Sequence, residues 1–369
     1  MFLFGHPKTL DSYVVGPSFR IAEQRSLVAS ISAALPLLKD AYLACAGALQ
    51  LLQVDTATEG ETTVSLRHAS SAMSILMTLS VSTVHDATLC LTMGTMLALY
   101  SYSAVGAGTA AICNYCLGTT APLLETATDA EINSKQGFLV LLEIMDCVFH
   151  RRKPTLRIRP QVASSVDRHL GLCLPLLQYY YDICVINHAV QSNTEMDHSI
   201  DVLMSLDELQ QILEEWQPSQ CGDLIVQYEA AEVVNLVAQA KVYRLCGLLL
   251  IHRSRYNFDE QDAQADIWSK EILMELDVAH GLTKRTIRCV TLPFLVAAVE
   301  LRDHNARLKV LQNLDFYVDQ GTTSVVKEAI TTFLKRIWFE RDFKTTTCWF
   351  DSICKPCVVL NSMYGDCFS

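Results

Sequence analysis

The chain has 369 residues, of which 50% are apolar and 19% charged, so it can bury a large core and is not globally disordered. Ten prolines and 15 glycines exclude a collagen-like or linker-dominated architecture. The net charge of −11 disfavours stand-alone binding to nucleic acid, which requires clustered Lys and Arg.

Apolar residues recur at helical spacing wherever a period can be counted. Leu66, Ala69, Met73 and Leu76 are three or four residues apart, which places them on one face of a helix. The same period recurs in residues 206–216, 234–249 and 326–337. The sequence contains no convincing alternating strands bounded by Asn-Gly or Asp-Gly turns. The chain is therefore predicted to be all-α.

The domain organisation follows from the breaks between these segments. They are short, and neither a long linker nor a fixed internal repeat divides the chain. We expect one large domain of packed antiparallel helices at residues 21–369, preceded by an N-terminal tail at residues 1–20. Pro36, Pro175 and Pro293 lie inside apolar helical runs, so we expect each to mark a first turn or a kink.

A stretch without charged residues extends from Ala87 to Leu124 and is long enough to cross a membrane. Several Thr, Ser and Gly residues interrupt it, however. Its flanks, Asp86 and Glu125, are acidic and provide no Lys or Arg bias. We expect a buried helix pair and no association with a membrane.

A basic segment stands out in the acidic chain. Its five positive charges are Arg151, Arg152, Lys153, Arg157 and Arg159. Pro154 and Pro160 predict an extended and exposed backbone. One interpretation is a solvated loop between helices. The other is a nuclear-import signal or a partner-docking patch, because acidic receptors recognise short Lys/Arg-rich segments.

The 14 cysteines do not indicate a disulfide scaffold. The N-terminus carries no recognisable secretion signal, so reduced thiols are expected. Six cysteines lie in apolar stretches predicted to be helical, where a thiol packs as a small apolar group: Cys45, Cys90, Cys173, Cys184, Cys246 and Cys289.

Two CxxC pairs occur, at residues 113–116 and 354–357, too far apart in sequence to read as one zinc motif. Cys348 and Cys367 could complete a site with the second pair, but apolar residues surround it. We therefore expect free thiols and no bound metal or cofactor.

Signatures of catalysis are weak. Residues 106–111 match the relaxed dinucleotide pattern GxGxxA, but a helix is predicted where that fold needs a strand, so a tight helix–helix connection is favoured. The GxSxG, HExxH and GxxxxGK[ST] motifs are absent from the sequence. His85 and Asp86 are better explained by a helix start with Asp86 as its capping or first-turn acid. No enzyme is predicted.

The C-terminal third contains a recognisable succession of motifs. TLPFLVAAVE at residues 291–300 is followed by Arg307, a glycine, EAITTFLKRIWFERD at 328–342 and CWFD at 348–351. This succession resembles the end of the fungal-specific transcription factor domain, the helical region downstream of a binuclear zinc–cysteine DNA-binding cluster. The residues that match the family pattern are Pro293, Glu300, Gly321, Trp338, Asp342 and Trp349. Ala298 stands where the family commonly has Gly.

Earlier segments are similar to the family more loosely, at residues 26–49, 86–100 and 230–255, so that the resemblance extends over about residues 20–352. The six-cysteine cluster is missing: Cys45 is the only cysteine before Cys90. Direct sequence-specific DNA binding by this chain is therefore not expected.

The resemblance implies a nuclear transcriptional regulator or co-regulator, of a kind often found in fungal secondary-metabolite gene clusters. It would act through contacts with another transcription factor or with its own copy. Two alternatives stay open. One is a helical small-molecule-binding or catalytic protein with an apolar pocket near residues 87–124. The other is an incomplete gene model whose upstream exon encodes the zinc cluster.

Overall fold

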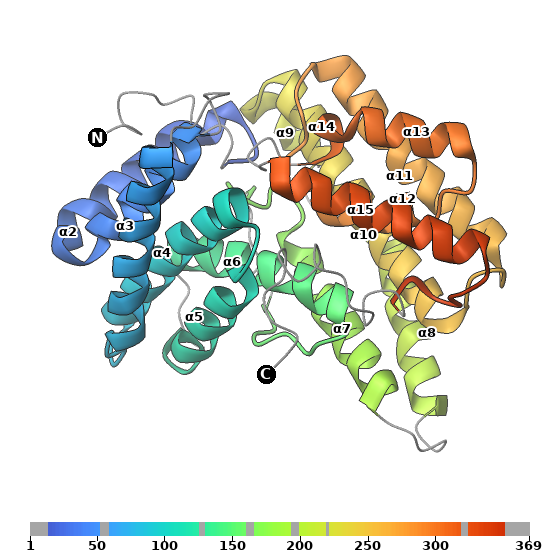
Figure 1. Cartoon of the computed structure of the whole chain (residues 1–369), viewed down its shortest axis with the longest axis horizontal. Coiled ribbons are helices and arrows are strands. Elements are labelled where there is room, and N and C mark those ends of the chain that lie inside the picture. The colour runs from blue at the N-terminus through green and yellow to red at the C-terminus, as the bar shows by residue number, and fades with distance from the viewer. Residues whose placement is uncertain are drawn as a thin grey trace.

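The computed structural model describes residues 14–51, 59–124, 130–159, 166–192, 199–218, 221–318 and 324–350 (Figure 1). Within these ranges the protein is a single all-α domain without a strand, and a lone bridge between Asp167 and Gly171 is the only β-type pairing there. The predicted fold class is confirmed.

Helices make up most of the described chain. They are η2 (Pro17–Phe19), α2 (Arg20–Leu51), α3 (Glu59–Thr78), α4 (Val84–Tyr100), the π-helical turn η3 (Ser101–Val105), α5 (Thr109–Leu124), α6 (Ala130–His150), η4 (Leu174–Leu176), α7 (Leu177–Ser192), α8 (Ser199–Glu215), α9 (Cys221–Gln227), α10 (Ala230–Arg255), α11 (Asp262–Thr283), α12 (Thr291–Val299), α13 (His304–Gln312), α14 (Leu314–Tyr317) and α15 (Ser324–Asp342).

The helices form two groups. Helices α2 to α6 lie on one side of the molecule, and those from α8 onward lie on the other (Figure 1). Consecutive helices pack in pairs, such as α2 with α3, α4 with α5, and α10 with α11. Helix α6 contacts α4 and α5 in the first group, and its contact with α7 connects it to the second.

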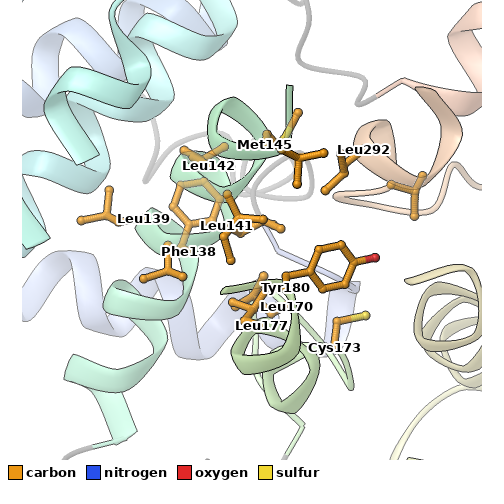
Figure 2. Packing of buried hydrophobic residues seen from close by; sticks show 14 of the residues in the cluster. Phe138, Leu139, Leu141, Leu142, Met145, Leu170, Cys173, Leu177, Tyr180 and Leu292 are labelled. Carbon is orange, nitrogen blue, oxygen red and sulfur yellow. The ribbon is translucent and has the colours of Figure 1, made fainter. Parts of the chain in front are cut away.

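The core at this junction is built around α6. Side chains of α6 such as Phe138, Leu142 and Met145 lie beside Tyr180 of α7 and Leu292 of α12 (Figure 2). Burying an apolar side chain of this size contributes about 1.5–3 kcal/mol. The Tyr180 hydroxyl donates to the carbonyl oxygen of Tyr243 at 2.7 Å, so this polar group is satisfied inside the core.

Pro36, Pro175 and Pro293 lie where the chemistry of proline requires. The backbone at Ala34 is non-helical (φ −141°, ψ 39°), which kinks α2 two residues before Pro36. Pro175 lies in the short η4 that leads into α7, and Pro293 lies in the first turn of α12. The predicted kinks and first turns are confirmed.

Residues 14–20 differ from the tail that the sequence suggests. Val14 and Phe19 are buried, and the Val15 amide donates to the carbonyl oxygen of Arg168 at 2.8 Å. The Ser18 amide and hydroxyl donate to the Glu232 carboxylate at 2.8 and 2.5 Å. The apolar residues favour burial, so this part of the predicted tail belongs to the helical domain.

The face that α3 buries is rotated from the predicted one. Ser65, Ala69 and Leu76 are buried, whereas Leu66 is 56% exposed. Small residues explain the rotation: a Cβ at Gly47 of α2 would lie only 2.1 Å from the Ser65 Oγ, so the two helices approach closely there.

The stretch from residue 87 to 124 forms the α4–α5 pair. In α4 every residue from Leu89 to Tyr100 is buried, whereas α5 buries one side and exposes Asn114. The Cβ that Gly94 lacks would lie 2.4 Å from Cys116 Sγ, so the glycine permits the close contact between the helices.

Three helical stretches of the described chain are long and apolar enough to cross a membrane: Pro17–Leu49, Val84–Val105 and Ala230–Arg255. In the apolar window of the last two, 78% of the residues are buried within the protein, against 39% in the first. Packing inside the domain accounts for the apolar character of the last two.

Candidate functional site

The basic segment follows α6 and is partly anchored to the protein. Arg151 has a positive φ of 49°, which ends the helix, and its guanidinium lies 4.3 Å from the ring centroid of Phe350. Its backbone oxygen is 3.0 Å from His188 Nδ1. Pro154, inside the segment, is buried rather than exposed, and the Thr155 amide donates to Glu143 at 3.0 Å.

The other charges of the segment differ in their exposure. Arg152 Nη1 donates to Asp146 at 3.3 Å, and Arg157 forms a two-point contact with Asp182 at 2.9 and 2.8 Å. The Arg152 side chain remains 45% exposed and the Arg157 side chain 42% exposed. Lys153 and Arg159 are exposed without a recorded ion pair in the described part of the chain. The segment is therefore a fixed loop that presents part of its charge to solvent.

Asp146 on α6 is buried beside this loop. Burial raises its pKa to about 6, and the neighbouring Arg152 acts in the opposite direction. Its Oδ1 atom has no hydrogen bond and lies 3.6 Å from His150 Nε2. Burial also lowers the pKa of His150 to about 4. The pair is therefore held in an environment that disfavours charge on either side chain.

A second cluster of charges lies around Glu300, one of the motif residues of the C-terminal third. Glu300, directly after α12, receives hydrogen bonds from Arg253 of α10, with Nε to Oε1 at 2.8 Å and Nη2 to Oε2 at 2.7 Å. Both side chains are 2% exposed. Arg253 also donates to Asp262 of α11 at 2.6 Å. Three helices are thus tied together by a desolvated ionic network.

Arg341 of α15 connects a fourth helix to this network. Its Nη1 lies 3.5 Å from the Glu300 carboxylate and donates to the backbone oxygen of the same residue at 3.0 Å. Its guanidinium lies 4.3 Å from the ring centroid of Phe258. Burial lowers the pKa of Arg341 to about 10, and Glu300 opposes this effect. Glu300 therefore counters two buried arginines.

Trp338 and Asp342 connect α15 to α12 and α13. The Trp338 indole Nε1 donates to the backbone oxygen of Ala298 at 2.9 Å. Arg307 of α13 donates to both Asp342 oxygens, at 2.5 and 2.9 Å, and lies 5.2 Å from the Trp338 ring centroid. These hydrogen bonds lower the pKa of Asp342. The motif residues therefore hold α12, α13 and α15 together.

Trp349 connects the end of the described chain to the basic segment. The centroid of its ring lies 5.5 Å from that of Phe149 and 3.9 Å from that of Phe350. The Arg151 guanidinium covers the Phe350 ring. The remaining motif residue, Gly321, lies outside the described residues.

The other sequence candidates are structural. Cys113 and Cys116 are buried in α5, and residues 354–357 and Cys367 lie outside the described residues. In the described chain no group of three or more His, Cys, Asp and Glu residues is placed to hold a metal ion. Of the six cysteines predicted to be helical, two lie outside helices: Cys173 directly precedes η4, and Cys289 lies in a turn with a φ of 56°.

The glycine and histidine candidates also have local explanations. Gly106 and Gly108, with φ of 73° and 80°, connect η3 to α5, which confirms the helix–helix connection. Asp86 forms a capping box with Thr83 at the start of α4, as the sequence predicts.

The apolar pocket expected near residues 87–124 is small. A cavity of about 30 Å³ lies between Tyr102, Thr109, Met145, Thr291 and Val326. That volume accommodates one or two water molecules and is far below the roughly 300–1,000 Å³ of typical ligand sites.

The partners of the motif residues could not be recognised individually from the sequence. Arg253 and Arg341 lie 47 and 41 residues from Glu300 along the chain. Because a buried carboxylate requires a cationic partner, the position of Glu300 at the end of an apolar segment indicated that some cation must lie nearby, but not which one. Asp262 carries no distinguishing signal.

The sequence model of one protein family, described as the fungal specific transcription factor domain, matches residues 44–362. No curated protein and no solved structure matches the chain. The match includes both the basic segment and the ionic network.

Proposed function

The chain belongs to the fungal-specific transcription factor domain family, and from this premise we propose that it regulates transcription through protein–protein contacts. The observation that carries the proposal is the extent of the family match, residues 44–362, together with the motif residues that build the ionic network. Glu300, Trp338 and Trp349 are buried, and the half-exposed Asp342 is paired with Arg307, so these contacts support a scaffold role for the motif residues. We propose no enzymatic activity.

The proposed partner is a related transcription factor or a second copy of the chain. The net charge of −11 disfavours binding to the DNA backbone. A partner with its own DNA-binding module would bring the domain to its target genes.

We propose the nucleus as the site of action, with the basic segment as the import signal. Lys153 and Arg159 are exposed, and Arg152 and Arg157 are half-exposed, so an acidic receptor can reach four of the five charges. Assignment to a secondary-metabolite gene cluster depends on the family resemblance alone.

The experiment combines localisation with DNA binding. A fluorescently tagged chain should accumulate in the nucleus, and the purified chain should bind random duplex DNA only weakly and without sequence preference. A tagged chain excluded from the nucleus would contradict the proposed localisation. Sequence-specific DNA binding would contradict the need for a partner. Sequencing the 5′ end of the transcript tests the alternative that an upstream exon encodes a zinc cluster.

A further inference from the structure

A second and larger hollow lies between α8, α10 and α11. Figure 1 shows where these three helices lie in the fold. This groove has a volume of about 440 Å³, within the range of about 300–1,000 Å³ typical of small-molecule sites. Its lining is mostly polar and includes Gln210, Arg244, Tyr256 and Trp268. Part of the lining comes from the family-like segment at residues 230–255, but none of the C-terminal motif residues contributes to it.

Arg244 is the unusual charge in this groove. Its Nη1 donates to the backbone oxygen of Glu214 at 3.3 Å, but no carboxylate of the described chain lies within ion-pair distance. The neighbouring cations are paired: Arg255 with Asp207 at 2.7 Å, and Lys241 with Glu271 at 3.1 Å. Arg244 therefore offers a charge that an anionic ligand can neutralise.

Aromatic side chains form another part of the groove. The His252 ring lies 4.9 Å from Tyr256 and 5.7 Å from Trp268, and the second pair is nearly perpendicular. His252 Nε2 lies 3.1 Å from the Gln261 backbone oxygen, which fixes the ring. Tyr256 is 37% exposed, so it presents aromatic surface to the groove. A planar ring can stack there.

The remaining lining suits a ligand that has an apolar part and a separate polar group. Leu245 and Leu248 of α10 are 2% and 3% exposed and supply an apolar part of the lining. Gln264 adds an amide, and Glu214 and Glu271 add carboxylates that accept hydrogen bonds. A ring with one carboxylate and one donor group matches these chemistries.

We propose that this groove binds a small aromatic carboxylate. The Arg244 guanidinium receives the carboxylate, and the ring packs beside Trp268 and Tyr256. The ligand contacts three helices at once and therefore stabilises their arrangement. This binding goes beyond the proposed regulatory function and does not depend on it.

The test is calorimetric titration of the purified full-length chain with indole-3-acetate and with 4-hydroxybenzoate. At least one should bind with a Kd below about 1 mM, and its uncharged amide should bind about 10- to 100-fold more weakly, because the charged hydrogen bond is lost. Arg244→Met should cause a similar loss, and Arg244→Lys a smaller one.

Two controls keep the result interpretable. Arg285→Met removes an exposed arginine outside the groove, paired with Glu229 at 3.5 Å, and should leave binding unchanged. A thermal melt of each variant establishes that it is folded. The proposal is overturned if neither carboxylate binds below about 1 mM, or if binding survives Arg244→Met in a folded protein.

Discussion

Replacing Glu300 with Gln removes the charge that holds the ionic network together. The variant keeps the shape of the side chain but removes the Glu300 charge from Arg253 and Arg341, which are 2% and 5% exposed and keep Asp262 as a carboxylate within 4 Å. Removing one partner of a buried ion pair costs about 3–5 kcal/mol. That is a large part of the roughly 5–15 kcal/mol by which a domain is stable.

The loss can be converted into a melting temperature. An unfolding entropy of about 2.1 cal/mol/K per residue over 369 residues gives about 0.8 kcal/mol/K, so Tm should fall by about 4–6 °C. Thermal unfolding followed by circular dichroism at 222 nm measures this.

The matched control is Asp266→Asn, which removes the same charge from an exposed pair with Lys270. It should change stability by at most about 0.5 kcal/mol. If Glu300→Gln melts within 1 °C of wild type, the network does not stabilise the fold as argued.

Other parts of the structure can be tested at Trp338, at Lys153 together with Arg159, and at Asp146. Trp338→Ala should lower the free energy of unfolding by about 3–5 kcal/mol and abolish regulation, because the indole is buried and donates to a backbone oxygen. A variant with the urea unfolding curve and the reporter output of wild type would contradict this prediction. Replacing Lys153 and Arg159 with Ala should reduce the nuclear signal in fluorescence imaging at unchanged Tm, since both are exposed; unchanged localisation would remove them from the import signal. Asp146→Asn should raise stability at pH 7.5 and not near pH 3.5. The pKa of Asp146 is about 6 in the folded protein and lower in the unfolded chain, so the wild-type protein loses stability as the pH rises and this carboxyl ionises. Equal melting temperatures of wild type and variant at pH 7.5 would refute this.

The helices were predictable because their signals are local. The capping acid Asp86 and the kink near Pro36 depend on residues a few positions away, so the sequence contains the needed information. The face buried by α3 was not predictable, because Gly47 on another helix decides how closely the two can approach. The burial of Val14 likewise depends on distant segments.

The same division applies to the functional candidates. Resemblance indicated Glu300 and Trp338, but their roles became visible only where α10, α12 and α15 meet. The basic segment was predicted as a unit, whereas Arg151 turns inward to Phe350. Simultaneous replacement of Arg151, Arg152 and Lys153 would therefore mix a packing effect with a recognition effect.

A tethered reporter assay tests the central claim most directly. The full chain, fused to a DNA-binding module from another protein, should change transcription of a reporter that carries the matching site. The fusion with Trp338→Ala should lose that effect, provided its abundance is matched. A wild-type fusion that is nuclear and abundant but leaves transcription at the level of the DNA-binding module alone would contradict the account.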